Sequence, residues 1–241
     1  MQKFLLEHRR YLFIAGAVFA ADLITKLLAY FFLPFNEEVS IAGRKLYLYL
    51  TYNFEATGGQ AEYVLGEVSK ANAKLVLSAV AGMILGGYIL LSQKLTLQPK
   101  WKVVIGVAVY AALSLVIETT HQAFEGVFSK HFTSWFTKAG AVFLYGSIFL
   151  VLQNKVLKAL LAVIIGCGLG NLVNHFYPPY HVIDFLYWDL LYQWLKMGIF
   201  NLADVLINAA ELMTGAYLLY WLGRKIIVRF TQPKIKVGTG A

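Results

Sequence analysis

The run VLKALLAVIIGCGLGNLVN at residues 156–174 decides the fold class of this chain of 241 residues. The hydrocarbon core of a bilayer is about 30 Å thick, so a helix needs about 20 mostly apolar residues to cross it. Similar runs recur along the chain and predict six membrane-spanning segments. Their ranges are 11–33, 73–92, 103–118, 137–153, 156–174 and 201–222. Each must be helical, because backbone N–H and C=O groups find no water in the hydrocarbon core.

The overall composition agrees with a membrane protein. Hydrophobic residues make up 59% of the chain and charged residues 14%, whereas soluble domains have about 45–50% and about 25%. These values exclude a water-soluble globular domain, a disordered chain and a nucleic-acid-binding protein with a basic surface. The single cysteine, Cys167, excludes an intrachain disulfide. We therefore predict an all-α polytopic membrane protein in which residues 1–241 form one integral membrane domain.

The basic residues predict the orientation of the helices. Most of the 21 lysine and arginine residues lie on one side of a six-span arrangement, in the segments 3–10, 94–102, 155–158 and 224–236. Basic loops stay in the cytoplasm, so both termini are expected there. A cleavable signal peptide within residues 1–21 is the alternative for the first segment. The apolar run continues to Phe35, which favours a membrane-spanning helix.

Some residues inside the expected spans are polar or very small. Asp22 and Lys26 are four positions apart, so they share a helix face and can form an ion pair. That pair is either a self-neutralising structural element or a functional one, because ionisable groups in spans are costly. Glu211 is expected to pack or to accept a hydrogen bond. A cluster of small residues, Gly166, Cys167, Gly168 and Gly170, predicts a close helix-packing face.

The densest polar cluster falls at the outer ends of the last two spans. Its members are Asn171, Asn174, His175, His181, Asp184, Asn201 and Asp204. The segment 185–194 between the two aspartates is rich in aromatic residues, which is typical of an interfacial belt or of a helix in the headgroup region. If it folds back on the membrane, Asp184 and Asp204 meet. Such a pair shares a proton and offers a general base and a general acid for activating water.

A metal centre is the competing interpretation of part of this cluster. His175, His181 and Asp184 carry suitable ligand atoms, but Pro178 and Pro179 break any regular helical spacing between the histidines. We therefore predict no metal site and no cofactor.

Four short motifs, in this order, resemble those of the lipoprotein signal peptidases (signal peptidase II). The segments are DLITK at 22–26, GN at 170–171, VIDF at 182–185 and FNLAD at 200–204. The family patterns are D-x-x-T-K, G-N-x-x-D-R, V-V-D-F and F-N-x-A-D. These enzymes are bacterial intramembrane aspartic proteases.

The resemblance implies a role for each matching residue. Asp184 and Asp204 correspond to the catalytic dyad, and Asn171 and Asn201 help to shape the site and position the substrate. Asp22 and Lys26 match the motif of the first span. The substrate implied is a diacylglyceryl-modified prolipoprotein, cleaved before its lipidated cysteine in the bacterial cytoplasmic (inner) membrane, near the outer face. The other partners implied are membrane lipids, and the protein is expected to be a monomer.

The chain also departs from the family pattern. Asn174 and His175 stand where the family has Asp-Arg, and one residue is inserted between them and Asp184. A protonated His175 is one way to replace the arginine. The outer N-T-G-A-A-F segment has two imperfect counterparts, at 56–61 and 121–124. The family has four spans, so an extra helical pair is expected within 62–153, together with a small outer interfacial segment in which short strands are an option.

Three functions remain open at this point. The first is an aspartic endopeptidase of the signal peptidase II type. The second is a catalytically impaired relative that binds lipoproteins or lipid, because of the change at Asn174 and His175. The third is a small membrane transporter subunit that uses Asp22, Lys26 and Glu211 as a polar relay.

Overall fold

The computed structural model describes residues 2–42, 45–53, 65–124, 130–177, 180–195 and 198–231. Six helices are long and apolar enough to cross a membrane: Leu6–Phe32, Ala73–Ser92, Pro99–Phe124, Phe132–Val151, Lys155–Phe176 and Leu202–Lys225. The predicted fold class and the six expected spans are confirmed. The third and fourth helices are longer than the ranges 103–118 and 137–153.

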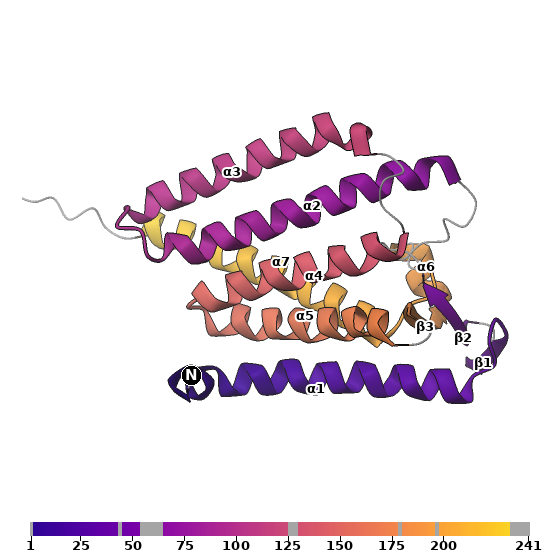
Figure 1. The fold of residues 1–241 in the computed structure, drawn as a ribbon. Helices are drawn as coiled ribbons and strands as arrows, with labels where there is room; N and C mark the ends of the chain where they lie inside the picture. Colours follow the sequence, from indigo (N-terminus) through magenta and orange to yellow (C-terminus); the bar gives the residue numbers. More distant parts are fainter. Residues whose placement is uncertain are drawn as a thin grey trace, which may run out of the picture.

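The described residues form twelve helices and strands in chain order, and their arrangement is shown in Figure 1. The helices are α1 (Gln2–Phe32), α2 (Leu65–Ser92), α3 (Pro99–Thr120), α4 (Lys130–Val151), α5 (Lys155–Val173), α6 (Asp189–Leu195) and α7 (Leu202–Thr231), with short 3-10 helices η1 (His121–Phe124) and η2 (Asn174–Phe176). The strands are β1 (Glu38–Ala42), β2 (Leu46–Asn53) and β3 (Val182–Trp188).

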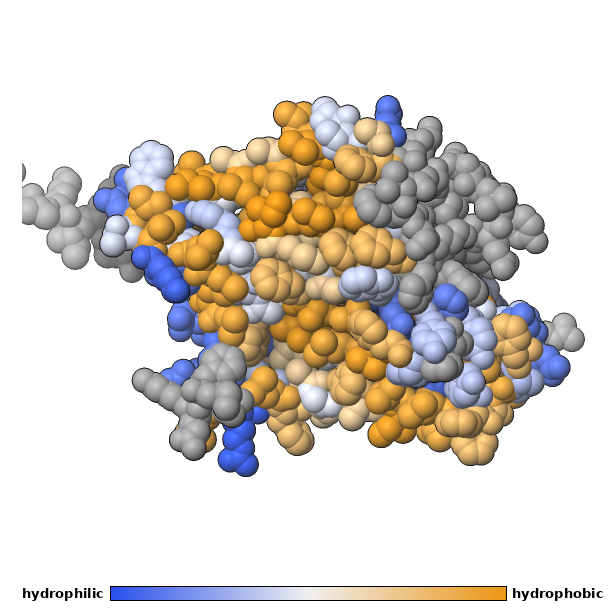
Figure 2. All heavy atoms as spheres, viewed as in Figure 1, coloured by the Kyte–Doolittle hydropathy of each residue, from blue (hydrophilic) through white to orange (hydrophobic). Residues whose placement is uncertain are grey.

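Helix α5 is the centre of the bundle. It packs against α1, α4 and α7, while α2 packs against α4 and α3 packs against α2 (Figure 1). The pair α2–α3 therefore forms an outer layer, and it falls inside the range 62–153 where an extra pair is expected. No residue of α3 is buried, and apolar side chains cover much of the face of the bundle that is seen in Figure 2. Such a surface is stable when lipid covers it.

The expected small segment with short strands is present as an antiparallel sheet in the order β1-β2-β3. The aromatic segment 185–194 is therefore divided between a strand and a short helix. Residues up to Trp188 belong to β3, and only α6 is helical. The reason is tertiary, because Ile183 and Phe185 pack with Ala29 and Leu50 in one hydrophobic cluster and β3 pairs with β2.

Strand β3 also fixes where α7 begins. Leu186 and Phe200 form an isolated antiparallel bridge, in which the Phe200 N–H donates to the Leu186 carbonyl at 2.8 Å. The residues that follow Phe200 start α7. The bridge therefore holds the first turn of α7 beside the strand that carries Asp184.

The predicted small-residue packing face on α5 is confirmed. A Cβ atom at Gly166 would lie 2.4 Å from the Ala15 carbonyl oxygen, and one at Gly170 would lie 2.3 Å from Asp22 Oδ2. On the other side of α5, a Cβ at Gly168 would lie 2.9 Å from Val142 Cγ2. The glycines let α1 and α4 approach α5 closely.

Replacing Gly166 by alanine tests this close approach. The added methyl group meets backbone of α1, so we expect Gly166→Ala to lower the free energy of unfolding by about 1–3 kcal/mol. Gly16→Ala is the matched control, because no atom lies within 4 Å of its Cβ position. Alanine there is expected to be neutral or stabilising by up to about 1 kcal/mol. Reversible unfolding in mixed micelles measures both, and equal effects would contradict the packing argument.

Candidate active site

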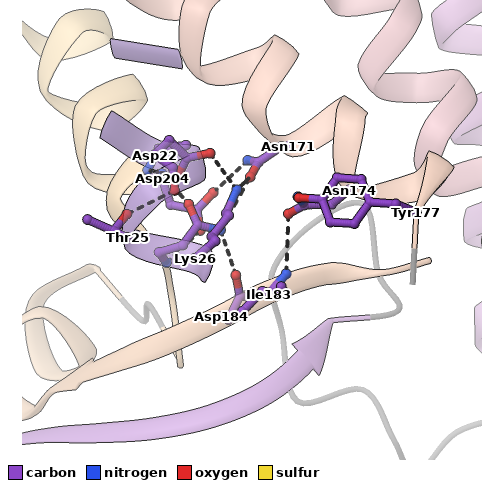
Figure 3. A network of polar contacts seen from close by, with 11 residues as sticks. Asp22, Thr25, Lys26, Asn171, Asn174, Tyr177, Ile183, Asp184 and Asp204 are labelled. Carbon is purple, nitrogen blue, oxygen red and sulfur yellow. Dashed lines mark hydrogen bonds and ion pairs between the residues drawn. The ribbon is translucent and has the colours of Figure 1, made fainter. Parts of the chain in front are cut away.

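Six polar side chains from α1, α5, β3 and the start of α7 converge in one hydrogen-bonded network (Figure 3). The relative exposure of five of them is 7% or less. They are Asp22, Lys26, Asn171, Asp184 and Asn201, with the half-buried Asp204 completing the set. Polar groups at such depth are stable only when they have partners.

Helix α1 contributes an ion pair. Lys26 Nζ lies 2.6 Å from Asp22 Oδ2, and both side chains are fully buried. The same ammonium group donates to Asn171 Oδ1 on α5. The spacing of four residues places both groups on the face of α1 that packs against α5, close to Gly170.

The first turn of α7 explains the spacing of the FNLAD segment. The Asn201 side chain accepts from the Asp204 N–H at 3.1 Å, and the Asp204 carboxylate accepts from the Asn201 N–H at 3.0 Å. This reciprocal pair is a capping box. A third N–H, that of Ala203, donates to Asp22 Oδ1 at 3.1 Å. Two of these three N–H groups are thus bound by carboxylates and one by an amide oxygen, and the helix dipole favours carboxylates at this end.

A hydrogen bond with Asn201 links Asp184 to the first turn of α7. In β3, Asp184 lies between Ile183 and Phe185, which pack into the hydrophobic cluster, and its own side chain points toward the polar network (Figure 3). Asn201 Nδ2 donates to Asp184 Oδ1 at 2.6 Å. Since the backbone of Asn201 also donates to Asp204, one residue contacts both carboxylates.

Asn171 completes the link between these groups. Its Nδ2 donates to Asp204 Oδ1 at 3.2 Å, and its Oδ1 accepts from Lys26 and, at 3.3 Å, from Asn201 Nδ2. Two carboxyl groups that accept hydrogen bonds from one residue, Asn201, can divide the roles of base and acid. The geometry is therefore suited to activating a water molecule.

Asn174 and His175 lie beside this network and have other partners. Asn174 Nδ2 donates to the Tyr177 hydroxyl, and its Oδ1 accepts from the Ile183 N–H at 3.5 Å. Asn174 thus ties the end of α5 to the start of β3. Burial raises the pKa of the Tyr177 hydroxyl, while the hydrogen bond with Asn174 lowers it by less. The phenol is therefore neutral near pH 7.

His175 points to two residues that the sequence did not single out. Its Nε2 lies 3.3 Å from Ser134 Oγ, and Ser134 accepts from Lys138 Nζ at 2.7 Å. Both residues are on α4. Ser134 lies before the predicted span 137–153, and Lys138 lies at its edge, where a lysine is ordinary. One sequence feature that could have drawn attention to Ser134 and Lys138 is their spacing of four residues, which is the same as that of Asp22 and Lys26.

The structure also bears on the predictions for Glu211, for a metal site and for the two loop segments. Tyr145 donates to Glu211 Oε1 at 3.3 Å, so Glu211 accepts a hydrogen bond as expected. Among the described residues, no three histidine, cysteine, aspartate or glutamate side chains come together as a metal ion requires. The segment 56–61 and the pair Pro178–Pro179 lie outside the described residues, and the other loop counterpart, 121–124, is η1.

Comparison with known proteins bears on this geometry. The sequence profile described as signal peptidase (SPase) II matches residues 111–221. The resemblance to signal peptidase II is confirmed. The matched region contains Asn171, Asp184, Asn201 and Asp204, and it supports a function of the signal peptidase II type in general. Asp22 and Lys26 precede it.

The chain was also compared with solved structures and with curated protein sequences. A solved structure described as a bacterial membrane enzyme, determined by the in meso method at 2.3 Å resolution, is 14% identical to this chain. The alignment covers 90% of this chain and 91% of that one, with a TM-score of 0.48. No curated protein sequence matches the chain.

Replacing Lys26 by methionine tests how far the candidate site depends on the buried ion pair. The change leaves the Asp22 carboxylate buried without its cation, so we expect a loss of about 3–5 kcal/mol in the free energy of unfolding. Lys74→Met is the matched control. Lys74 pairs with Glu118 at 2.7 Å, but the two side chains are 51% and 65% exposed, and exposed pairs contribute about 0–1 kcal/mol. Similar losses in both variants would contradict the importance of the buried pair.

Proposed function

We propose that this chain is an intramembrane aspartic endopeptidase that removes the signal peptide from diacylglyceryl-modified prolipoproteins. The single observation that carries the proposal is that Asn201 donates hydrogen bonds to both Asp184 and Asp204. The two carboxylates named by the sequence motifs, 20 positions apart, thereby share one partner. The signal peptidase II match over residues 111–221 supports the same reaction type.

The reaction proceeds by attack of water on the peptide carbonyl before the lipidated cysteine. The ionised carboxylate of the pair accepts a proton from the water, and the protonated one donates its proton to the carbonyl oxygen. In the tetrahedral intermediate that results, the C–N bond breaks as the amine takes a proton from the newly protonated carboxyl group. A hydroxyl of the intermediate returns a proton to the other carboxylate as the carbonyl re-forms, which restores the dyad. The products are a signal peptide with a new carboxylate and a lipoprotein whose cysteine has a free amine.

The surroundings of the dyad suit this substrate. Asp184 and Asn201 are 1% and 0% exposed, which limits bulk water. Many large apolar side chains of the bundle are exposed, among them those on the face seen in Figure 2, so a signal helix and two acyl chains can approach the site from the bilayer. Strand β3 and α6, with the aromatic residues of 185–194, cover the polar end of the bundle. The proposal includes a monomer in the bacterial cytoplasmic membrane, both termini in the cytoplasm, and no cofactor.

Neutralising either aspartate tests the proposal. We expect Asp184→Asn and Asp204→Asn each to lower the rate of signal peptide release by at least about 100-fold, because each removes a proton-transfer group. The assay follows release of the signal peptide from a purified lipidated precursor in detergent. Glu211→Gln is the matched control, since it changes a carboxyl group on the same helix as Asp204 and keeps an acceptor for Tyr145.

The outcome separates this function from binding alone. A wild-type protein that binds the precursor but cleaves no faster than the two asparagine variants would overturn the endopeptidase and favour a lipoprotein-binding relative.

A further inference from the structure

We propose that the helical bundle holds a second binding site, away from the aspartates, for one anionic phospholipid. A cavity of about 330 Å³ lies between α1, α2, α4 and α5, and its volume is in the range of ligand sites. The lining residues on α1 and α5 come before Asp22 and Asn171 in those helices. The cavity therefore lies toward the end of the bundle where α1 and α5 begin and α4 ends (Figure 1). The site does not depend on the proposed endopeptidase function.

The cavity is apolar and reaches the lipid-facing surface of the bundle. The rings of Tyr11 and Phe149 line it and are buried, with 4% and 6% exposure. Three other lining side chains, Leu12, Phe143 and Leu150, are 42%, 44% and 44% exposed. An apolar hollow that extends from buried rings to the bilayer is suited to part of an acyl chain.

Two cations lie on the aromatic lining of the cavity. The Arg10 guanidinium lies 4.5 Å from the centre of the Tyr11 ring and donates a hydrogen bond to the Tyr11 hydroxyl. Lys158 Nζ lies 5.2 Å from the centre of the Phe149 ring. The two rings pack edge to face with their centres 5.7 Å apart. One arginine from α1 and one lysine from α5 therefore lie beside the same pair of rings.

These rings are held in place without a ligand. The ring of His8 packs edge to face against Phe149 at 5.3 Å and against Tyr11 at 6.5 Å. Tyr11 and Phe149 also belong to the hydrophobic cluster that joins α1, α4, α5 and α7. A preformed site of this kind loses little conformational freedom when it binds.

The charge beside the cavity favours an anion. Among the described residues, neither Arg10 nor Lys158 forms an ion pair with a carboxylate. Basic pockets between membrane helices on the cytoplasmic side bind anionic lipid headgroups. The basic segments of the chain predict that this end of the bundle faces the cytoplasmic leaflet, which contains anionic lipids.

Charge also favours a lipid over the signal peptide of the proposed substrate. The first region of a signal peptide is positively charged, so Arg10 and Lys158 repel it and attract a phosphate group. A negative headgroup joined to an acyl chain matches both the cations and the apolar cavity. We therefore assign the site to a phospholipid with a net negative charge.

Lipid-dependent thermal stability tests the headgroup part of the site. We expect phosphatidylglycerol to raise the Tm of the detergent-solubilised protein by about 2–4 °C more than phosphatidylcholine with the same acyl chains does. The double change Arg10→Gln, Lys158→Gln is expected to abolish this difference. The matched control is Lys100→Gln, Lys102→Gln, which removes two positive charges from α3, a helix that does not line the cavity.

Filling the cavity tests its acyl-chain part. Gly146 on α4 lines the cavity, and no atom lies within 4 Å of its Cβ position. Gly146→Leu is therefore expected to fold, since leucine also favours a helix over glycine, and to lose most of the extra rise in Tm with phosphatidylglycerol. Gly215→Leu on α7 is the matched control, because its Cβ position is equally open and it does not line the cavity.

The outcomes decide whether the site exists and what it binds. Equal effects of the two lipids on the wild type would overturn the site, and so would the same response in a variant and its matched control. An unchanged lipid difference in Arg10→Gln, Lys158→Gln or in Gly146→Leu would also overturn it. Glycerol phosphate carries the anion without an acyl chain. If it raises the Tm as much as phosphatidylglycerol does, the site binds a free phosphate ester and the assignment to a lipid is wrong.

Discussion

The buried carboxylate of Asp22 is the constraint on which the rest of the site depends. One oxygen binds the ammonium group of Lys26, and the other accepts the Ala203 N–H at the start of α7. The same carboxylate lies so close to Gly170 that α5 has no room for a side chain there. A single group therefore fixes three helices relative to one another, and a buried charge that is satisfied by both oxygens tolerates little movement.

The start of α7 shows how helix capping and chemistry use the same atoms. Asn201 and Asp204 cap the helix reciprocally. Asp204 is also one of the two carboxylates, and Asn201 is also the donor that reaches Asp184. A capping box has its own stabilising effect, so the local sequence selects the geometry before any substrate binds. The proposed dyad is preorganised in this sense, because the carboxylate of Asp204 is oriented by the helix that carries it.

The sequence predicted the features that depend on residues close together in the chain. It did not predict the features that depend on contacts between distant residues. The six spans, the Asp22–Lys26 pair and the small-residue face of α5 depend on composition and on helical periodicity, and all three are present. Short strands in the outer segment were one option among several, because the partner of β3, strand β2, is more than 100 residues earlier in the chain and no local pattern specifies their pairing. The contact between His175 and Ser134 is of the same kind. It joins two helices through a pair of side chains, and no local pattern specifies it.

The balance of charge in the site connects its structure to the proposed reaction. Asp22 is neutralised by its contact with Lys26. The remaining carboxyl groups, Asp184 and Asp204, both accept hydrogen bonds from Asn201. In a region of low dielectric constant, two neighbouring carboxyl groups do not easily carry two negative charges at once. A pair that holds one proton is the state that can accept a proton from water and donate another to a carbonyl oxygen. The hydrogen bonds of Asn201 hold the two carboxyl groups in the arrangement that such a division of roles requires.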